Sequence, residues 1–122
     1  MLTENDIVRI SQRIVSAYGP LAVATFGSYA IGCAHERSDL DLLVIMASSQ
    51  SPALRAWDVR RLLFDVICPL DIHVFTAQGF EDSVYEELSF TWVIARQARL
   101  YHWSEDLKLA VASLLPRLAL TN

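Results

Sequence analysis

Hydrophobic residues recur along this chain with a helical period in some segments and as short apolar runs in others. The first segment opens with a Thr3-x-x-Asp6 pattern, which is typical of a helix capping box, and stops at Gly19-Pro20. Between these signals lie apolar residues at helical spacing: Ile7, Ile10, Ile14 and Tyr18. The pattern predicts an amphipathic helix that ends before residue 20.

The remaining chain alternates apolar runs with helical segments. Short runs at 21–26, 39–46 and 69–76 predict buried strands, and "RLYHW" at 99–103 predicts a short edge strand. Helices are predicted from 52 to about 64 and over 80–98, and a final apolar helix is predicted from Ser104. The helix at 52–64 is expected to show Arg55, Arg60 and Arg61 to solvent or to a ligand. We therefore predict a small α/β or α+β sheet covered by helices, with residues 1–122 as one domain and 104–122 as a C-terminal helical appendage.

Composition narrows the range of functions. The chain has 122 residues, 53% of them hydrophobic and 20% charged, and a formal net charge of −4. An acidic chain does not favour direct nucleic-acid binding, which works by phosphate neutralisation on a basic face. Cys33 and Cys68 have neither metal-type nor CxxC spacing, the N-terminus does not resemble a signal peptide, and no apolar run reaches membrane-spanning length. We expect a cytoplasmic protein that does not enter a membrane.

Candidate chemistry gathers in "FGSYAIGCAHERSDLDLLVIM", residues 26–46. Because side chains alternate along a strand, Asp39 and Asp41 point to the same face at the start of the run 39–46. Two like charges this close raise the pKa of at least one carboxyl, and a divalent cation compensates them. Carboxylate oxygens favour Mg²⁺ or Mn²⁺. The alternative is a solvated loop-to-strand junction in which the acids cap and solubilise.

Gly27 and Ser28 supply a second candidate feature. A glycine directly after a strand lets the backbone approach a ligand, and the amides of the turn can point at a phosphate group. The alternative is an ordinary strand-to-helix turn with a serine cap. Asp71, in the apolar run 69–76, is the candidate third carboxylate. His73 lies on the same strand face as Asp71, but a partly exposed strand histidine explains it equally well, and we leave it out of the predicted site.

The stretch "GSYAIGCAHERSDLDLLV", with Gly-Ser, ten residues and Asp-x-Asp, resembles the minimal nucleotidyltransferase family of the DNA polymerase β-like superfamily. With "PLDIHVFT" and "IARQARLY", the resemblance covers nearly the whole chain. It implies a mixed sheet flanked by helices, the polymerase β-like palm fold. It also implies that Gly27 and Ser28 hold the phosphates of ATP, and that Asp39, Asp41 and Asp71 are the catalytic, Mg²⁺-binding acids.

The resemblance further implies a role. Small members resemble antitoxins that transfer AMP to a tyrosine of a HEPN-type RNase toxin, so the predicted activity is a magnesium-dependent protein adenylyltransferase with a toxin as partner. One departure is Ile31, which stands where many relatives carry arginine; His35, Arg37 or the arginines of 52–64 are candidates to replace that contact. The alternatives are a non-catalytic antitoxin with a vestigial site and an aminoglycoside-type adenylyltransferase. Three interpretations stay open for the apolar C-terminal segment 104–122: it packs on the protein's own sheet, it docks on the partner, or it joins a second copy of the chain.

Overall fold

The computed structural model describes residues 1–47 and 50–104. In chain order its elements are α1 (Glu4–Tyr18), β1 (Ala22–Phe26), α2 (Gly27–Ile31), β2 (Leu40–Ile45), α3 (Pro52–Leu62), β3 (Leu70–Phe75), α4 (Ala77–Val84), α5 (Phe90–Gln97) and β4 (Arg99–Trp103). The strands form one four-stranded sheet in the order β3-β2-β1-β4. β2 runs parallel to β3, whereas β1 is antiparallel to both β2 and β4. The predicted small sheet with flanking helices is confirmed, and the sheet is mixed.

Helix α1 begins and ends where the sequence predicts. The Thr3 hydroxyl accepts a hydrogen bond from the Asp6 backbone N–H at 3.1 Å, and the Asp6 carboxylate accepts one from the Thr3 N–H at 2.7 Å. These two bonds satisfy backbone donors that a helix N-terminus leaves without a partner. Gly19 ends the helix in the left-handed conformation, with φ of 55°.

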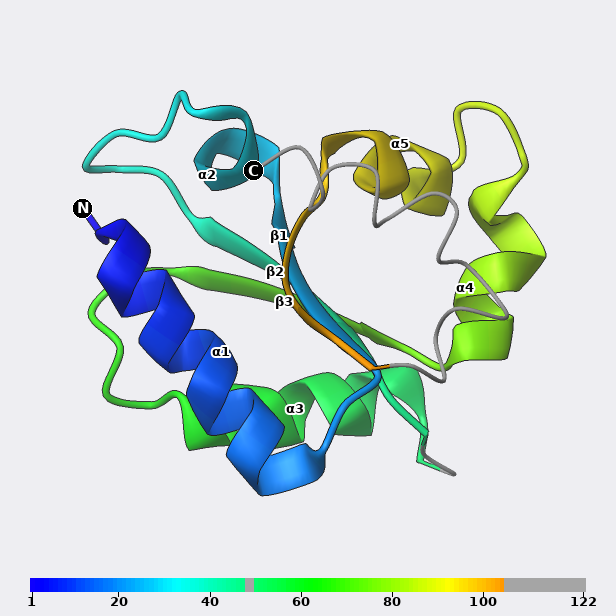
Figure 1. The fold of residues 1–122 in the computed structure, drawn as a ribbon, viewed down its shortest axis with the longest axis horizontal. Coiled ribbons are helices and arrows are strands. Elements are labelled where there is room, and N and C mark those ends of the chain that lie inside the picture. The colour runs from blue at the N-terminus through cyan, green and yellow to red at the C-terminus, as the bar shows by residue number, and fades with distance from the viewer. Residues whose placement is uncertain (48–49, 105–122) are drawn as a thin grey trace.

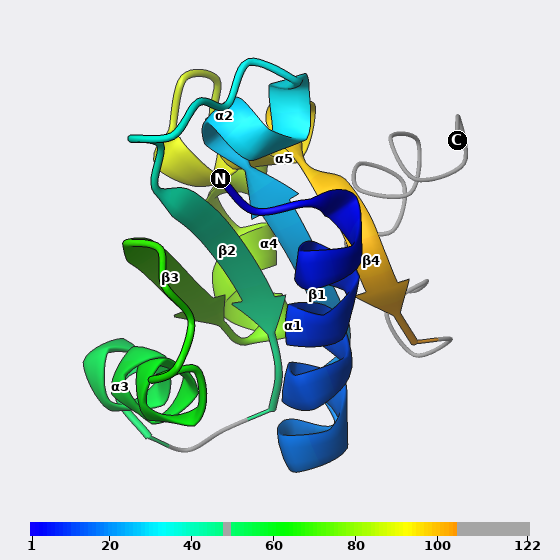
Figure 2. The same ribbon diagram turned by 90° about the vertical axis from the view of Figure 1, so that its left-hand side faces the viewer.

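Helices cover both faces of the sheet, as Figures 1 and 2 show. On one face, α1 and α3 pack against alternate strand residues such as Val23, Leu42 and Val44. On the other face, α4 and α5 pack against residues of the opposite alternation, such as Leu43 and Ile45. Each inner strand is therefore apolar on both faces, which explains its unbroken apolar run.

Two expectations from the sequence are wrong. The segment 80–98 is two helices, α4 and α5, because the Ser89 hydroxyl accepts a hydrogen bond from the Trp92 N–H and starts a new helix, while Leu88 has a left-handed φ of 69°. Arg55 does not face solvent or ligand. Its side chain is only 6% exposed, and its Nη1 donates to the Gln50 carbonyl.

The predicted edge strand at 99–103 is confirmed as β4, which lies at one edge of the sheet. The predicted C-terminal helix falls almost entirely on residues 105–122, outside the described residues. Within the ranges that the structure describes, no helix is long and apolar enough to cross a membrane.

Candidate functional site

Strand register brings two of the predicted acids together. In the parallel pair of β2 and β3, Asp41 lies opposite Asp71, and in the antiparallel pair of β1 and β2, Asp41 lies opposite Phe26. Residues opposite each other in a sheet point to the same face, here the face that α4 and α5 cover further along the strands. The two aspartates lie beside the end of β1, where the Gly27-Ser28 turn begins.

The Gly27 backbone lies directly against the Asp41 side chain. A Cβ atom at residue 27 would stand 2.2 Å from Asp41 Oδ2 and 3.1 Å from its Cγ, and Gly27 has a left-handed φ of 68°. Both the contact and the dihedral angle require glycine. The Gly27 turn of the "GS" motif and Asp41 of the "DLD" motif are separate in sequence but adjacent in the structure.

Asp41 lies in an environment that disfavours its negative charge. Partial burial, followed by the negative charges of Asp71 and Asp39 and a hydrogen bond with Asp71, raises its pKa to about 6, while His73 acts in the opposite direction. A carboxyl with such a pKa holds a proton in mildly acidic solution. A bound cation would remove the repulsion and favour the ionised form, so the pair has the chemistry of a cation ligand.

Asp39 lies just before β2 and is exposed. Across residues 1–47 and 50–104, no group of three or more acidic, histidine or cysteine side chains is arranged to hold a metal ion. The geometry therefore brings together Asp41 and Asp71, whereas Asp39 acts on Asp41 through its charge. Oxygen ligands from neighbouring aspartates still suit Mg²⁺ or Mn²⁺, and the three-aspartate metal site stays a prediction.

The structure adds neighbours that sequence reasoning missed. His73 Nε2 lies 3.1 Å from Asp71 Oδ1, and the His73 ring lies 4.8 Å from the ring of Phe90, between centroids. From the last turn of α5, Gln97 Oε1 accepts a hydrogen bond from the Gly27 N–H at 3.1 Å. His73 carried a signal, its shared strand face with Asp71. Phe90 and Gln97 carried none, because only the tertiary fold brings α5 to this place.

Comparison with known protein families identifies the family of this chain. The profile of the nucleotidyltransferase domain matches residues 7–99. The chain belongs to the nucleotidyltransferase domain family. No match to this domain was found among curated proteins.

Solved structures share the fold of this nucleotidyltransferase domain. A toxin-antitoxin structure with AMP-PNP superposes with a TM-score of 0.59 at 18% identity, over 95% of this chain and 86% of that one. A mutant of the toxin-antitoxin MntA-HpeT gives 0.57 at 17% identity, over 95% and 86%. A candidate nucleotidyltransferase from Sulfolobus solfataricus gives 0.54 at 22% identity, over 82% and 78%. At these identities, the likeness establishes the fold.

The basic residues of the domain bear on the departure at Ile31, which ends α2 and is 58% exposed. Helix α3 packs on the face of the sheet opposite Asp41 and Asp71. Within α3, Arg55 binds the Gln50 carbonyl, and Arg60 Nη2 donates to the Leu70 carbonyl at 2.9 Å. The arginines of α3 are therefore poorly placed to make the contact that the resemblance predicts for an arginine at residue 31. Of the candidates from the sequence, His35 and Arg37 remain, exposed in the loop before β2.

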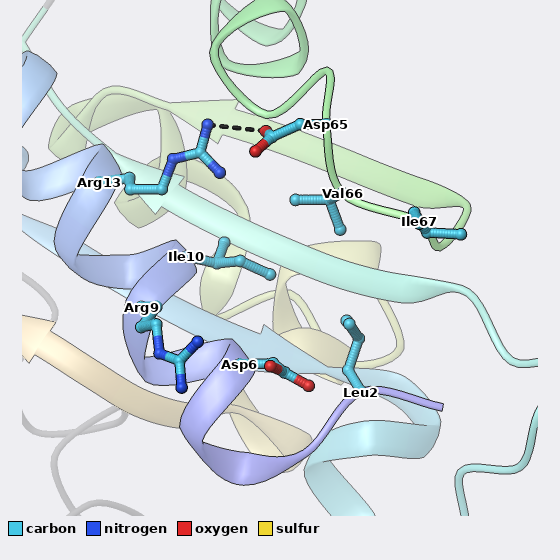
Figure 3. A pocket seen from close by; sticks show the side chains of 8 residues that line it. All are labelled: Leu2, Asp6, Arg9, Ile10, Arg13, Asp65, Val66 and Ile67. Atoms are coloured by element: carbon cyan, nitrogen blue, oxygen red, sulfur yellow. Dashed lines mark hydrogen bonds and ion pairs between the residues drawn. The ribbon is translucent and has the colours of Figure 1, made fainter.

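A pocket of about 440 Å³ lies away from the two aspartates, on the side of α1 and the segment before β3 (Figure 3). Its lining residues are Leu2, Asp6, Arg9, Ile10, Arg13, Asp65, Val66 and Ile67. Arg13 crosses it to Asp65 at 2.8 Å. This hollow lies on the α1 side of the sheet, away from the face that carries Asp41 and Asp71, and the site chemistry does not involve it.

Proposed function

We propose that this domain is a magnesium-dependent nucleotidyltransferase that transfers AMP from ATP to a hydroxyl group on a partner protein, a tyrosine of a HEPN-type RNase toxin. The observation that carries the proposal is the pairing of Asp41 with Asp71 against the Gly27 turn in a domain of the nucleotidyltransferase family. The structural neighbour with AMP-PNP supports an adenine nucleotide as substrate, and its toxin-antitoxin nature supports the acceptor.

In this proposal Gly27 and Ser28 hold the phosphates, and Asp41 and Asp71 hold the metal. Asp39, an exposed side chain whose charge already reaches Asp41, completes the set by turning toward it. When bound, Mg²⁺ or Mn²⁺ supplies positive charge that neutralises the phosphate oxygens. The raised pKa of Asp41 supports this assignment, because the protein places negative charges together that a cation would stabilise.

At the α-phosphorus, the transfer forms one P–O bond and breaks another. The acceptor hydroxyl oxygen attacks the α-phosphorus of ATP, and the bond from that phosphorus to the oxygen bridging to the β-phosphorus breaks. Pyrophosphate leaves, and the hydroxyl proton passes to the carboxylate of Asp71, acting as general base. Gly27 and Ser28 keep the phosphate chain in place during the attack, so that the reacting atoms stay in line.

We propose further that residues 1–122 are a single domain and that the apolar segment 104–122 packs on the domain's own sheet, contacts the toxin or joins a second copy. A binding antitoxin with a vestigial site is the second candidate. It is favoured by Ile31, an exposed apolar side chain where a phosphate-binding arginine would be expected. An aminoglycoside acceptor is less favoured, because the structural neighbour with AMP-PNP is a toxin-antitoxin structure.

The test uses ATP labelled at the α-phosphate, Mg²⁺ and the product of the neighbouring gene. Wild type should label a tyrosine of that partner, and EDTA should stop the reaction. Asp41→Asn and Asp71→Asn should lose the label, whereas Asp82→Asn, an exposed acid on α4, should keep it. If no label appears and the double variant Asp39→Asn, Asp41→Asn still suppresses toxicity, the binding antitoxin is correct.

A further inference from the structure

An aromatic cluster lies beside the predicted site and packs against His73. The His73 ring centroid lies 5.6 Å from that of Phe26 and 4.8 Å from that of Phe90, and the Phe26 and Phe90 rings meet edge to face at 5.9 Å. Phe26 ends β1, His73 belongs to β3, and Phe90 is the first residue of α5. Three elements therefore fix one imidazole ring.

The polar edge of this ring faces Asp71. His73 Nε2 is buried and 3.1 Å from Asp71 Oδ1, but the two atoms are not aligned as a hydrogen bond, so Nε2 counts as a buried polar atom without a hydrogen-bond partner. A buried ring nitrogen left in that state is unfavourable. The Asp71 side chain is 53% exposed and can rotate, whereas the rings of Phe26 and Phe90 restrict His73. A small rotation of the carboxylate would complete the bond.

We propose that His73 is a positioning residue that fixes the carboxylate of Asp71, and that Phe90 holds the imidazole ring in place for that purpose. The inference rests on the proposed function, in which Asp71 binds metal and accepts the hydroxyl proton. One oxygen of Asp71 is held by His73 and the other is left for these roles. Without His73, the exposed side chain of Asp71 would sample several rotamers.

The chain allows a sharp set of variants. His73→Phe keeps a ring between Phe26 and Phe90 but removes both nitrogens. His73→Gln places an amide N–H near the position of Nε2, and His73→Asn places one near the other ring nitrogen. His102→Phe is the matched control, because His102 is a partly buried histidine on β4 that bonds the Pro20 carbonyl.

The first measurement is Mn²⁺ affinity in the presence of α,β-methylene-ATP, followed by electron paramagnetic resonance, which needs no turnover. We expect His73→Phe and His73→Asn to weaken Mn²⁺ binding roughly tenfold to a hundredfold, as loss of a residue that orients a metal ligand does. His73→Gln should restore most of the affinity, Phe90→Leu should weaken it less than His73→Phe, and His102→Phe should leave it unchanged. In transfer assays, His73→Phe should lower kcat with little change in KM for ATP.

Thermal unfolding of each variant serves as the control that the variant is folded. Equal Mn²⁺ affinity in wild type and His73→Phe would overturn the inference, because His73→Phe keeps the ring packing but has no donor. It would also be overturned if His73→Gln, which keeps a donor, weakened Mn²⁺ binding as much as His73→Phe. If wild type binds Mn²⁺ but labels no partner, the transfer proposal fails while the affinities still decide the role of His73. If wild type binds no Mn²⁺, both proposals fail.

Discussion

Replacing Asp41 by asparagine should stabilise the metal-free protein at neutral pH. The pKa of Asp41 is raised from 3.8 to about 6 by partial burial and by Asp71 and Asp39. A carboxyl whose pKa is raised by folding stabilises the protein below the unfolded value, and that contribution is lost as the pH rises through about 6. Asparagine carries no charge at any pH, so its contribution to the stability of the fold does not change over this range.

The magnitude follows from the two pKa values. A difference of about two pH units corresponds to roughly 3 kcal/mol of unfolding free energy. Water still reaches Asp41 and screens its charge, so we expect about 1 kcal/mol between pH 4 and pH 7.5. For a domain of this size, that amounts to about 4 °C in Tm.

The assay is thermal unfolding in EDTA at pH 4, 5, 6, 7 and 7.5 for wild type, Asp41→Asn and Glu87→Gln. Glu87 is exposed in the segment between α4 and α5, so Glu87→Gln removes one negative charge away from the pair. The Tm of Asp41→Asn minus that of wild type should grow with pH, mostly around pH 6, and Glu87→Gln should show no such growth. Mg²⁺ should then stabilise wild type and leave Asp41→Asn unchanged. A Tm difference for Asp41→Asn that is independent of pH would refute the raised pKa.

Three other changes test separate parts of the structure. Gly27→Ala should destabilise the domain by at least about 1 kcal/mol more than Gly32→Ala, because both have a left-handed φ but only residue 27 has a neighbouring carboxylate; denaturation in urea measures the difference, and equal losses would contradict the contact. Ile31→Arg should tighten ATP binding roughly tenfold through a charged hydrogen bond, whereas neutral Ile31→Gln should not. Titration with fluorescent ATP measures the affinity, and equal affinities for wild type and Ile31→Arg would show that residue 31 in α2 is remote from the phosphates. Ser89→Ala should cost about 1 kcal/mol of unfolding free energy by removing the cap of α5, and an unchanged urea midpoint would argue against that cap.

Much of the fold is visible in local sequence signals. The capping box at Thr3, the stop at Gly19 and the apolar runs place α1 and the inner strands within a residue or two. The break between α4 and α5 was missed because apolar spacing continues across it. Ser89 was the available signal, since serine before an apolar run is a common helix cap.

Only part of the candidate site could be predicted from local sequence signals as well. Strand alternation placed Asp39 and Asp41 on one face of their strand, but the adjacency of Asp41 and Asp71 depends on β3 pairing beside β2 in parallel, which no local pattern specifies. Gln97 is 70 residues from Gly27, and only the packing of α5 brings its side chain to the turn. Arg55 was misjudged because arginine on a helix is usually solvated, whereas here its guanidinium bonds to the backbone before α3.

The position of the two acids depends on core residues rather than on the acids themselves. Like charges repel, so Asp41 and Asp71 do not favour their own pairing. Ile72 and Val74 lie on the other face of β3 and are buried against α1 and α3. Their burial fixes the register that places Asp71 beside Asp41. A slip of one residue would turn both apolar side chains away from that core and move Asp71 to the other face. Hydrophobic burial thus opposes the repulsion and holds together a pair of carboxylates that a proton or a bound cation would stabilise.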